Sequence, residues 1–239
     1  MLLKLKEKIL DLDIKAQPDD VTCGPTCLHG VYQFYNDEIP LKQVIQEVKQ
    51  LSSGGTLAVV LANHALRRGY KATIYTYNLS TFDISWFKDQ VDLKEKLRAQ
   101  LKVKSGDLRL QVATEEYLQF LESGGQIRFE ELTPTLIKSF LTKGMPILTG
   151  LSATYLYESP RETGDIVIRY DDVLGEPTGH FVIINGFNQE DRVAFIADPL
   201  EANPISGKQY YKVSLQKLIN SILLGVMTYD ANLLIIYPK

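Results

Sequence analysis

The two cysteines of the chain both fall in one short stretch, Q-P-D-D-V-T-C-G-P-T-C, at residues 17–27. Cys23 directly precedes Gly24-Pro25, and proline is favoured in the first turn of a helix. At a helix N-terminus, unpaired backbone N–H groups and the positive end of the helix dipole favour the thiolate form of a cysteine. The position of Cys23 therefore indicates a nucleophile, provided that a histidine base lies within reach.

Three histidines are candidates for that base, at positions 29, 64 and 180. His29 lies six residues after Cys23 in the same expected helix, so it cannot share the position of the cysteine at the helix tip. His64 falls inside another expected helix, where a core or partly exposed histidine is the ordinary outcome. His180 opens an apolar strand, G-H-F-V-I-I-N-G-F, directly after a polar loop. A histidine at the edge of a strand can lean across a cleft, so His180 is the predicted base.

Two further polar residues complete the expected site. Asp198 ends the next apolar strand, V-A-F-I-A-D-P, and the short polar turn N-Q-E-D-R between the two strands predicts an antiparallel hairpin. The start of one strand then lies beside the end of the other, where the carboxylate can fix the histidine tautomer. Gln17 carries a neutral side-chain amide that, with the backbone N–H of Cys23, can hold a developing oxyanion.

Other uses of the cysteines fit the sequence less well. Structural zinc needs four ligands, and no second pair of cysteines or histidines is present. A thioredoxin-like redox pair needs C-x-x-C, whereas the spacing here is C-x₃-C. Cys27 falls one turn below Cys23 on the apolar face of the expected helix and is predicted to be a buried core thiol. Taken singly, Gln17, His180 and Asp198 each have an ordinary loop or strand-end explanation, but their combination favours a catalytic site.

These segments resemble a known family, the papain-like cysteine peptidases of the bacteriocin-processing, double-glycine-leader type and their stand-alone relatives. The matching segments are residues 17–27, G-H-F-V-I-I-N-G-F at 179–187 and V-A-F-I-A-D-P at 193–199. The resemblance implies a bacterial peptidase in which Cys23 is the nucleophile, His180 the general base and acid, Asp198 the orienting carboxylate and Gln17 the oxyanion donor. It also implies a papain-like fold and a peptide or protein substrate.

Composition and patterning predict one α+β domain over residues 1–239. Helical patterns dominate the first half of the chain and strands the second, which is typical of α+β folds with an antiparallel sheet. Charged amphipathic patterns predict a helical insertion at about residues 80–130. The net charge of −3 indicates no attraction to nucleic acid, and the apolar C-terminal run is broken by Asp230 and Asn232, so no membrane segment is expected. The N-terminus lacks the apolar region of a signal peptide, which makes the cytoplasm the expected compartment.

Some segments outside the shared motifs are candidates for substrate contact. The tyrosine-rich segment 151–162 is interpreted as a strand near the cleft. Its residues Tyr155, Tyr157 and Arg161 are candidates to bind a peptide or a carboxylate. Residues 52–56, S-S-G-G-T, form a helix-capping turn or a substrate-binding turn. Asp171, Asp172 and Glu176 are expected to form a solvated acidic loop rather than a cation site.

The sequence thus predicts a cysteine peptidase that cuts a peptide or isopeptide bond through a Cys-His-Asp triad and an acyl-enzyme, without metal or cofactor. Two alternatives stay open. On the same fold, an amine or thiol instead of water would make the protein an acyltransferase or transpeptidase. A non-catalytic binding module would keep the fold as a scaffold and have a Cys23 of ordinary reactivity. The oligomeric state is not predicted.

Overall fold

The computed structural model describes residues 6–51, 54–88, 91–164 and 169–239. The α-helices are α1 (Cys23–Phe34), α2 (Leu41–Glu47), α3 (Ala58–Arg67), α4 (Leu93–Val103), α5 (Leu108–Glu122), α6 (Pro134–Thr142), α7 (Ala153–Tyr157) and α8 (Leu215–Leu224), with 3₁₀ turns η1 (Ile84–Phe87) and η2 (Gly225–Thr228). The strands are β1 (Glu7–Ile9), β2 (Lys71–Thr76), β3 (Gln126–Arg128), β4 (Ile147–Ser152), β5 (Glu162–Thr163), β6 (Arg169–Tyr170), β7 (Gly179–Asn188), β8 (Val193–Ala197), β9 (Tyr210–Ser214) and β10 (Asn232–Tyr237).

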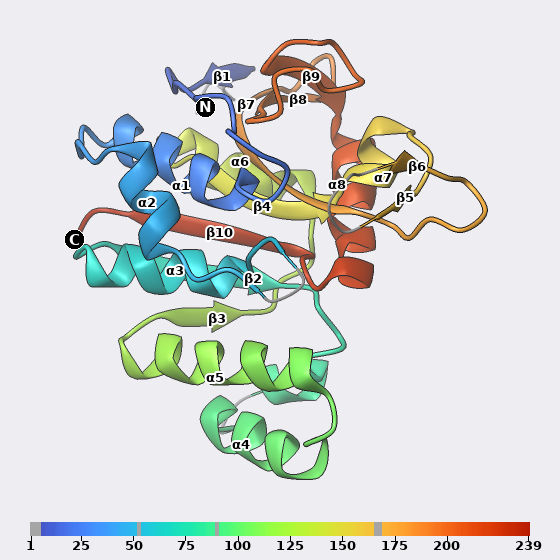
Figure 1. Cartoon of the computed structure of the whole chain (residues 1–239). Helices are drawn as coiled ribbons and strands as arrows, with labels where there is room; N and C mark the ends of the chain where they lie inside the picture. Colours follow the sequence, from blue (N-terminus) through green and yellow to red (C-terminus); the bar gives the residue numbers. More distant parts are fainter. Residues whose placement is uncertain (1–5, 52–53, 89–90, 165–168) are drawn as a thin grey trace.

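One large sheet runs through the middle of the molecule (Figure 1). Its strand order is β3-β2-β10-β4-β7-β8-β9, and β1 pairs with the far half of β7. All of these pairings are antiparallel except that of β2 with β3, which is parallel. Long β7 pairs with three strands, so it ties the N-terminal segment, β4 and β8 together at the centre of the sheet.

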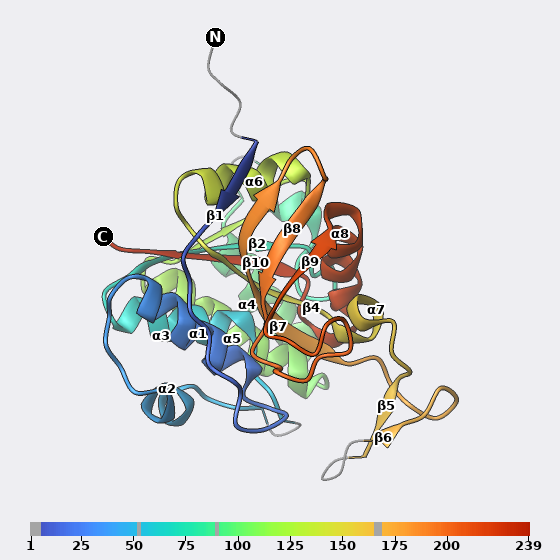
Figure 2. The same ribbon diagram turned by 90° about the horizontal axis from the view of Figure 1, so that it is seen from above.

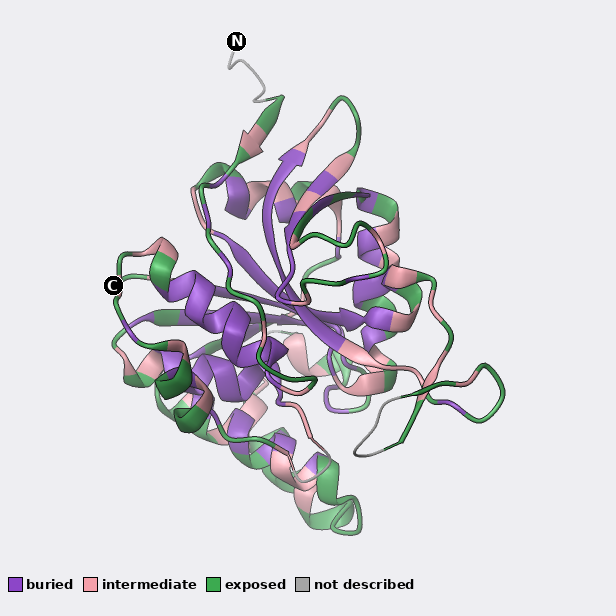
Figure 3. Cartoon of the chain, turned by 45° about the horizontal axis from the view of Figure 1, so that its top comes forward, coloured by how far each residue is buried: buried purple, intermediate pink, exposed green. Residues whose placement is uncertain are grey.

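Helices cover both faces of this sheet, which explains why its central strands are apolar on both sides (Figures 1 and 3). Helices α1, α3 and α5 contribute to one core cluster, and α6, α7 and α8 contribute to the other. Successive residues of β7 alternate between the two clusters: Ile183 packs with the first, and Val182 and Ile184 pack with the second. The strand that carries His180 is therefore held rigidly from both sides.

The predicted α+β class is confirmed, with the early helices, the later sheet and the β7–β8 hairpin in their expected places. Residues 80–130 form α4 and α5 as expected, but they also contain β3, which the pattern missed. Only Ile127 of this three-residue strand is buried, and an alternation this short cannot be distinguished from a loop. The assignment of residues 1–239 to a single domain stays a prediction.

The strand reading of segment 151–162 is partly wrong. Ser152 ends β4 and accepts a hydrogen bond from the backbone N–H of Tyr155, which caps the short helix α7. This cap turns the chain away from the sheet, and Tyr155 and Tyr157 become helical residues.

Among the described residues, no helix combines the length and the apolar character needed to span a bilayer.

Candidate active site

Cys23 is the first residue of α1, as the Gly-Pro signal predicts. Its side chain is nearly buried, with 8% exposed, and it lines a cleft of about 710 Å³. Gly24 allows this placement because a Cβ there would press on Thr56, Leu61 and Phe181, where α1 meets α3 and β7. The first N–H groups of a helix have no intrahelical acceptor, so the thiol lies beside free donors at the helix tip.

His180 lies on β7, between Cys23 and Asp198. Its Nε2–H donates to Asp198 Oδ1 at 2.8 Å, and its side chain is 8% exposed. Burial alone would lower the pKa of His180, but the Asp198 carboxylate and Cys23 outweigh burial and raise this pKa to about 10. Because Nε2 is taken by Asp198, Nδ1 is the ring nitrogen left for the thiol.

Asp198 is fully buried directly after β8, where it accepts four hydrogen bonds. Besides His180, the backbone N–H of Leu200 donates to Oδ1 at 2.9 Å. The hydroxyls of Tyr157 and Tyr211 donate to Oδ2 at 2.7 and 2.6 Å. Burial tends to raise the pKa of Asp198, yet the His180 charge and these donors lower it overall, so the carboxylate is ionised at neutral pH.

The sequence did not identify Tyr157 and Tyr211 as hydrogen-bond donors to Asp198. Burial and the neighbouring Asp198 raise the pKa of both phenols well above the usual value, which keeps their hydroxyls protonated as donors. The available signal was the alternating strand that follows Asp198, in which Tyr211 is a buried position between exposed neighbours. This alternation is consistent with a buried side chain at Tyr211, but it does not identify Asp198 as the hydrogen-bond partner.

We expect the loss of either phenol hydroxyl to destabilise the fold. Removing a hydrogen bond to a buried charged group costs about 1.5–3 kcal/mol, so Tyr211→Phe and Tyr157→Phe should each lower the free energy of unfolding by that order. Urea denaturation followed by circular dichroism measures the effect. Tyr155→Phe is the matched control, because the Tyr155 hydroxyl lies in an exposed contact with Asn220. Equal stability of all three variants would contradict the expected role of the buried pair.

Gln17 is held next to the Asp198 turn, since its backbone N–H donates to the carbonyl of Pro199 at 2.9 Å. Its side-chain Nε2 donates to the Asp19 carbonyl at 2.8 Å, which leaves the second amide hydrogen for another acceptor. Gln17 Oε1 is buried without a partner among the described residues. The structure thus places the Gln17 backbone next to the Asp198–Pro199 turn, and the role of Gln17 as an oxyanion donor stays a prediction.

The three residues predicted to contact substrate have partners within the protein. Tyr157 donates to Asp198, and the Tyr155 hydroxyl accepts from Asn220 Nδ2 at 3.2 Å. Arg161 Nη2 donates to the carbonyls of Asp172 and Val173 at 2.6 and 3.2 Å, which closes the acidic loop. None of the three lines the cleft, and their contact with substrate stays a prediction.

The cleft lining combines segments that the sequence singled out with others that it did not. Gly54, Gly55 and Thr56 belong to it, whereas Ser52 and Ser53 lie outside the described residues. The prediction that this turn caps a helix is wrong for residues 54–56, because the N-cap residue of α3 is Leu57 and no side chain caps that helix. The other lining residues come from α5, β5, the loop before β7 and the turn before β10; they include Arg109, Glu162, Leu174, Glu176, Pro177, Thr178, Met227, Thr228 and Asp230.

The remaining cysteine and histidines are core residues. Cys27 is fully buried, as predicted, and its thiol donates to the Phe181 carbonyl at 3.2 Å. Burial, Cys23 and Asp198 raise the pKa of Cys27 well above its usual value. His64 binds the Tyr32 hydroxyl and Glu47, and His29 is buried without a partner for either ring nitrogen among the described residues. No group of three metal-ligating side chains occurs in the part of the chain that the structure describes.

Comparisons with known proteins establish the fold. No protein-family model and no curated protein sequence matches the chain. Among solved structures, a protein described as a C39-like peptidase from Bacillus anthracis aligns over 98% of each chain with a TM-score of 0.52 and 14% identity. This chain therefore has the papain-like fold of C39-like peptidases.

Two further solved structures are similar at lower scores. A double glycine motif protease from an AMS/PCAT transporter, in complex with its leader peptide, has a TM-score of 0.45 and 16% identity, and the alignment covers 97% of this chain and 95% of that one. Xylellain, a cysteine protease from Xylella fastidiosa, has a TM-score of 0.45 and 11% identity, with 98% of this chain and 87% of that one covered.

Proposed function

We propose that the protein is a cysteine peptidase that hydrolyses a peptide or isopeptide bond. The observations that carry this proposal are the position of Cys23 at the start of α1 in the lining of the cleft and the hydrogen bond of His180 to Asp198. Cys23 lies close enough to His180 to contribute to its raised pKa. Thiol, imidazole and carboxylate in this order are the groups that nucleophilic acyl transfer needs. The fold shared with C39-like peptidases supports the same chemistry.

The raised pKa of His180 determines how the pair would act. At neutral pH the imidazolium form of His180 is favoured, and its positive charge would stabilise the negative charge of the attacking sulfur. The thiolate sulfur would attack the carbonyl carbon of the substrate, and the carbonyl oxygen would become an oxyanion. The backbone N–H of Cys23 and the free amide hydrogen of Gln17 are the proposed donors to that oxygen.

The rest of the cycle would restore both groups. As the C–N bond breaks, His180 gives its proton to the leaving amine, and the acyl group stays on Cys23 as a thioester. Water then attacks the thioester carbon and gives a proton to His180, and the C–S bond breaks. The products are a carboxylic acid and an amine, and the thiolate–imidazolium pair is regenerated.

The pH dependence of Cys23 alkylation by iodoacetamide tests this proposal. In a Cys27→Ser background, we expect fast labelling at neutral pH that becomes slower by about tenfold or more in His180→Ala, since a thiolate is the reactive species. His64→Ala is the matched control, because His64 bonds to Tyr32 and Glu47. Labelling at the same rate in wild type and in His180→Ala would overturn the assignment and favour a binding module.

A further inference from the structure

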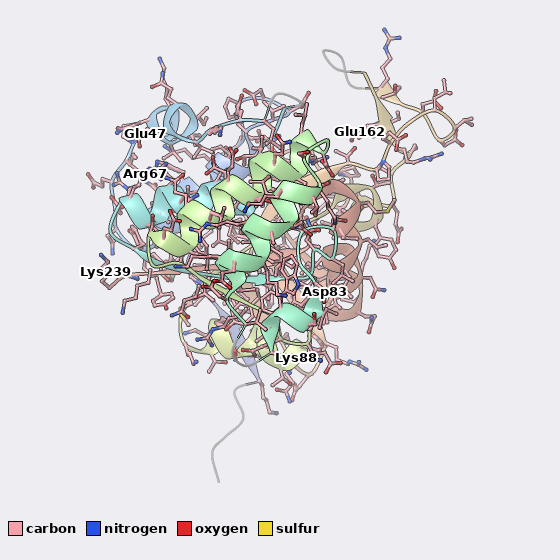
Figure 4. All side chains as sticks on the ribbon, turned by 90° about the horizontal axis from the view of Figure 1, so that it is seen from below. Glu47, Arg67, Asp83, Lys88, Glu162 and Lys239 are labelled. Atoms are coloured by element: carbon pink, nitrogen blue, oxygen red, sulfur yellow. The ribbon has the colours of Figure 1, made fainter. Side chains whose placement is uncertain are left out.

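The cleft beside Cys23 has an acidic lining. Four carboxylates line it, those of Asp20, Glu162, Glu176 and Asp230, and Arg109 is the one cation among the lining residues that the structure describes. Glu162 comes from the β5–β6 arm that projects from the body of the molecule (Figures 2 and 4). Across the described ranges, none of the four carboxylates forms an ion pair within the protein.

Arg109 is already engaged by the protein. Its guanidinium donates to the Thr228 carbonyl at 2.8 Å and stacks on the Tyr229 ring at 4.4 Å from the centroid. Because these contacts hold the arginine at the turn before β10, it does not form a direct pair with any carboxylate of the cleft. The lining therefore keeps an excess of negative charge.

Asp230 is the most deeply placed of the four carboxylates. It is 6% exposed, yet it lines the cleft. The Thr228 hydroxyl donates to Oδ2 at 3.0 Å, and no other described group donates to this carboxylate. Glycines make room for it on two neighbouring strands, because a Cβ at Gly150 or at Gly179 would collide with the Asp230 side chain. Gly179 directly precedes His180, so the carboxylate lies against the residue next to the proposed catalytic histidine.

A nearly buried carboxylate with one donor is poorly compensated. Buried charges in proteins are ordinarily paired or fully hydrogen-bonded, since isolated ones carry a large desolvation cost. Burial raises the pKa of Asp230 to about 7, although Thr228, Arg109 and His180 each act to lower it. An ammonium or guanidinium group that entered the cleft would supply both the missing donors and the counter-charge.

We propose that Asp230 is a specificity-determining residue that binds a lysine or arginine side chain of the peptide next to the scissile bond. Glu162 and Glu176 add negative charge to the same cleft, so the favoured substrate is a basic peptide. This inference rests on the proposed peptidase function, because only a peptidase would cleave the bound peptide. The binding preference itself can be measured without catalysis.

Binding to the Cys23→Ala protein tests the proposal directly. The probes are fluorescent peptides that carry either lysine or its neutral isostere norleucine at each position in turn, measured by anisotropy. At one position at least, lysine should bind about tenfold tighter than norleucine, and Asp230→Asn should remove this preference. Asp11→Asn is the matched control, because Asp11 is exposed and outside the cleft lining.

The pH dependence of the same preference provides a second readout. The lysine preference should grow between pH 6 and pH 8 as Asp230 ionises, and it should be flat in Asp230→Asn. The other titratable or charged groups that act on Asp230 are Arg109, His180 and Tyr117, and none of them changes charge in this range. Equal binding of lysine and norleucine peptides, or a preference that survives Asp230→Asn, would overturn the assignment.

Hydrolysis of the same peptides by the protein with Cys23 intact separates the two proposals. Cleavage that does not depend on lysine or on Asp230 would support the peptidase function and contradict the proposed binding site for a basic side chain. Binding that depends on Asp230 without cleavage of any peptide would support that binding site and contradict the peptidase function. Glu162→Gln and Glu176→Gln, at exposed or half-exposed positions, keep the test possible if Asp230→Asn does not fold. Each should weaken binding of the lysine peptides more at low salt than at high salt.

Discussion

Replacing Cys23 with alanine should abolish peptide hydrolysis, with a loss in kcat of about 1,000-fold or more. The physical reason is that the proposed reaction passes through a thioester on this sulfur, and the described structure offers no second thiol in the cleft. Hydrolysis of a peptide that the wild-type protein cuts, followed by mass spectrometry of the products, measures the loss. Trapping of a thioester on wild-type Cys23 by rapid quenching would reveal the intermediate.

Cys27→Ser is the control for this prediction. Cys27 lies one turn along the same helix but is fully buried, with its thiol on the Phe181 carbonyl. A serine hydroxyl can donate to the same carbonyl, so this variant should fold and keep its activity within a few-fold of wild type. Hydrolysis that persists in Cys23→Ala, or that disappears in Cys27→Ser while the fold is retained, would contradict the nucleophile assignment.

The second large effect is expected for Asp198→Asn. Removal of the carboxylate takes away the main group that raises the pKa of His180, so burial then lowers this pKa. The imidazolium is lost at a lower pH, and the thiolate loses its counter-charge. We expect kcat/KM at neutral pH to fall by about 100-fold or more, and the alkaline limb of its pH profile to move down from near 10.

A pH series from 5 to 11 on wild type and Asp198→Asn measures both parts of this prediction. Asp191→Asn, in the exposed turn between β7 and β8, is the matched control with the same chemical change. An alkaline limb that stays in place in Asp198→Asn would show that this carboxylate does not control the protonation of His180.

The same ion pair predicts a pH dependence of stability. His180 has a raised pKa in the folded chain, so its contribution is complete below its usual pKa of 6.5 and is lost as pH rises toward 10. Asp198 has a lowered pKa, so its contribution is present above its usual pKa of 3.8 and is lost as pH falls below that value. The stability deficit of Asp198→Asn should therefore be largest between about pH 4 and pH 6.5.

Local patterns were sufficient to predict much of the candidate site. Cys23 begins a helix because Gly24-Pro25 suits a first turn, and that depends on neighbouring residues alone. His180 and Asp198 were expected to be neighbours because two apolar strands with a short polar turn form a hairpin. Their side chains do meet, with 2.8 Å between Nε2 and Oδ1. The α+β class followed in the same way from hydrophobic periodicity.

Other parts of the site depend on contacts between distant segments, which no local pattern encodes. Tyr157 lies 41 positions before Asp198 in the sequence and donates to it from α7, the short helix that Ser152 caps. Asp230 was visible in the sequence as a break in an apolar run, but no local pattern indicated that Gly150 and Gly179 would lie against it. Residue types and turns thus determined which groups could do chemistry, and only the packing of the sheet decided which of them share one cleft.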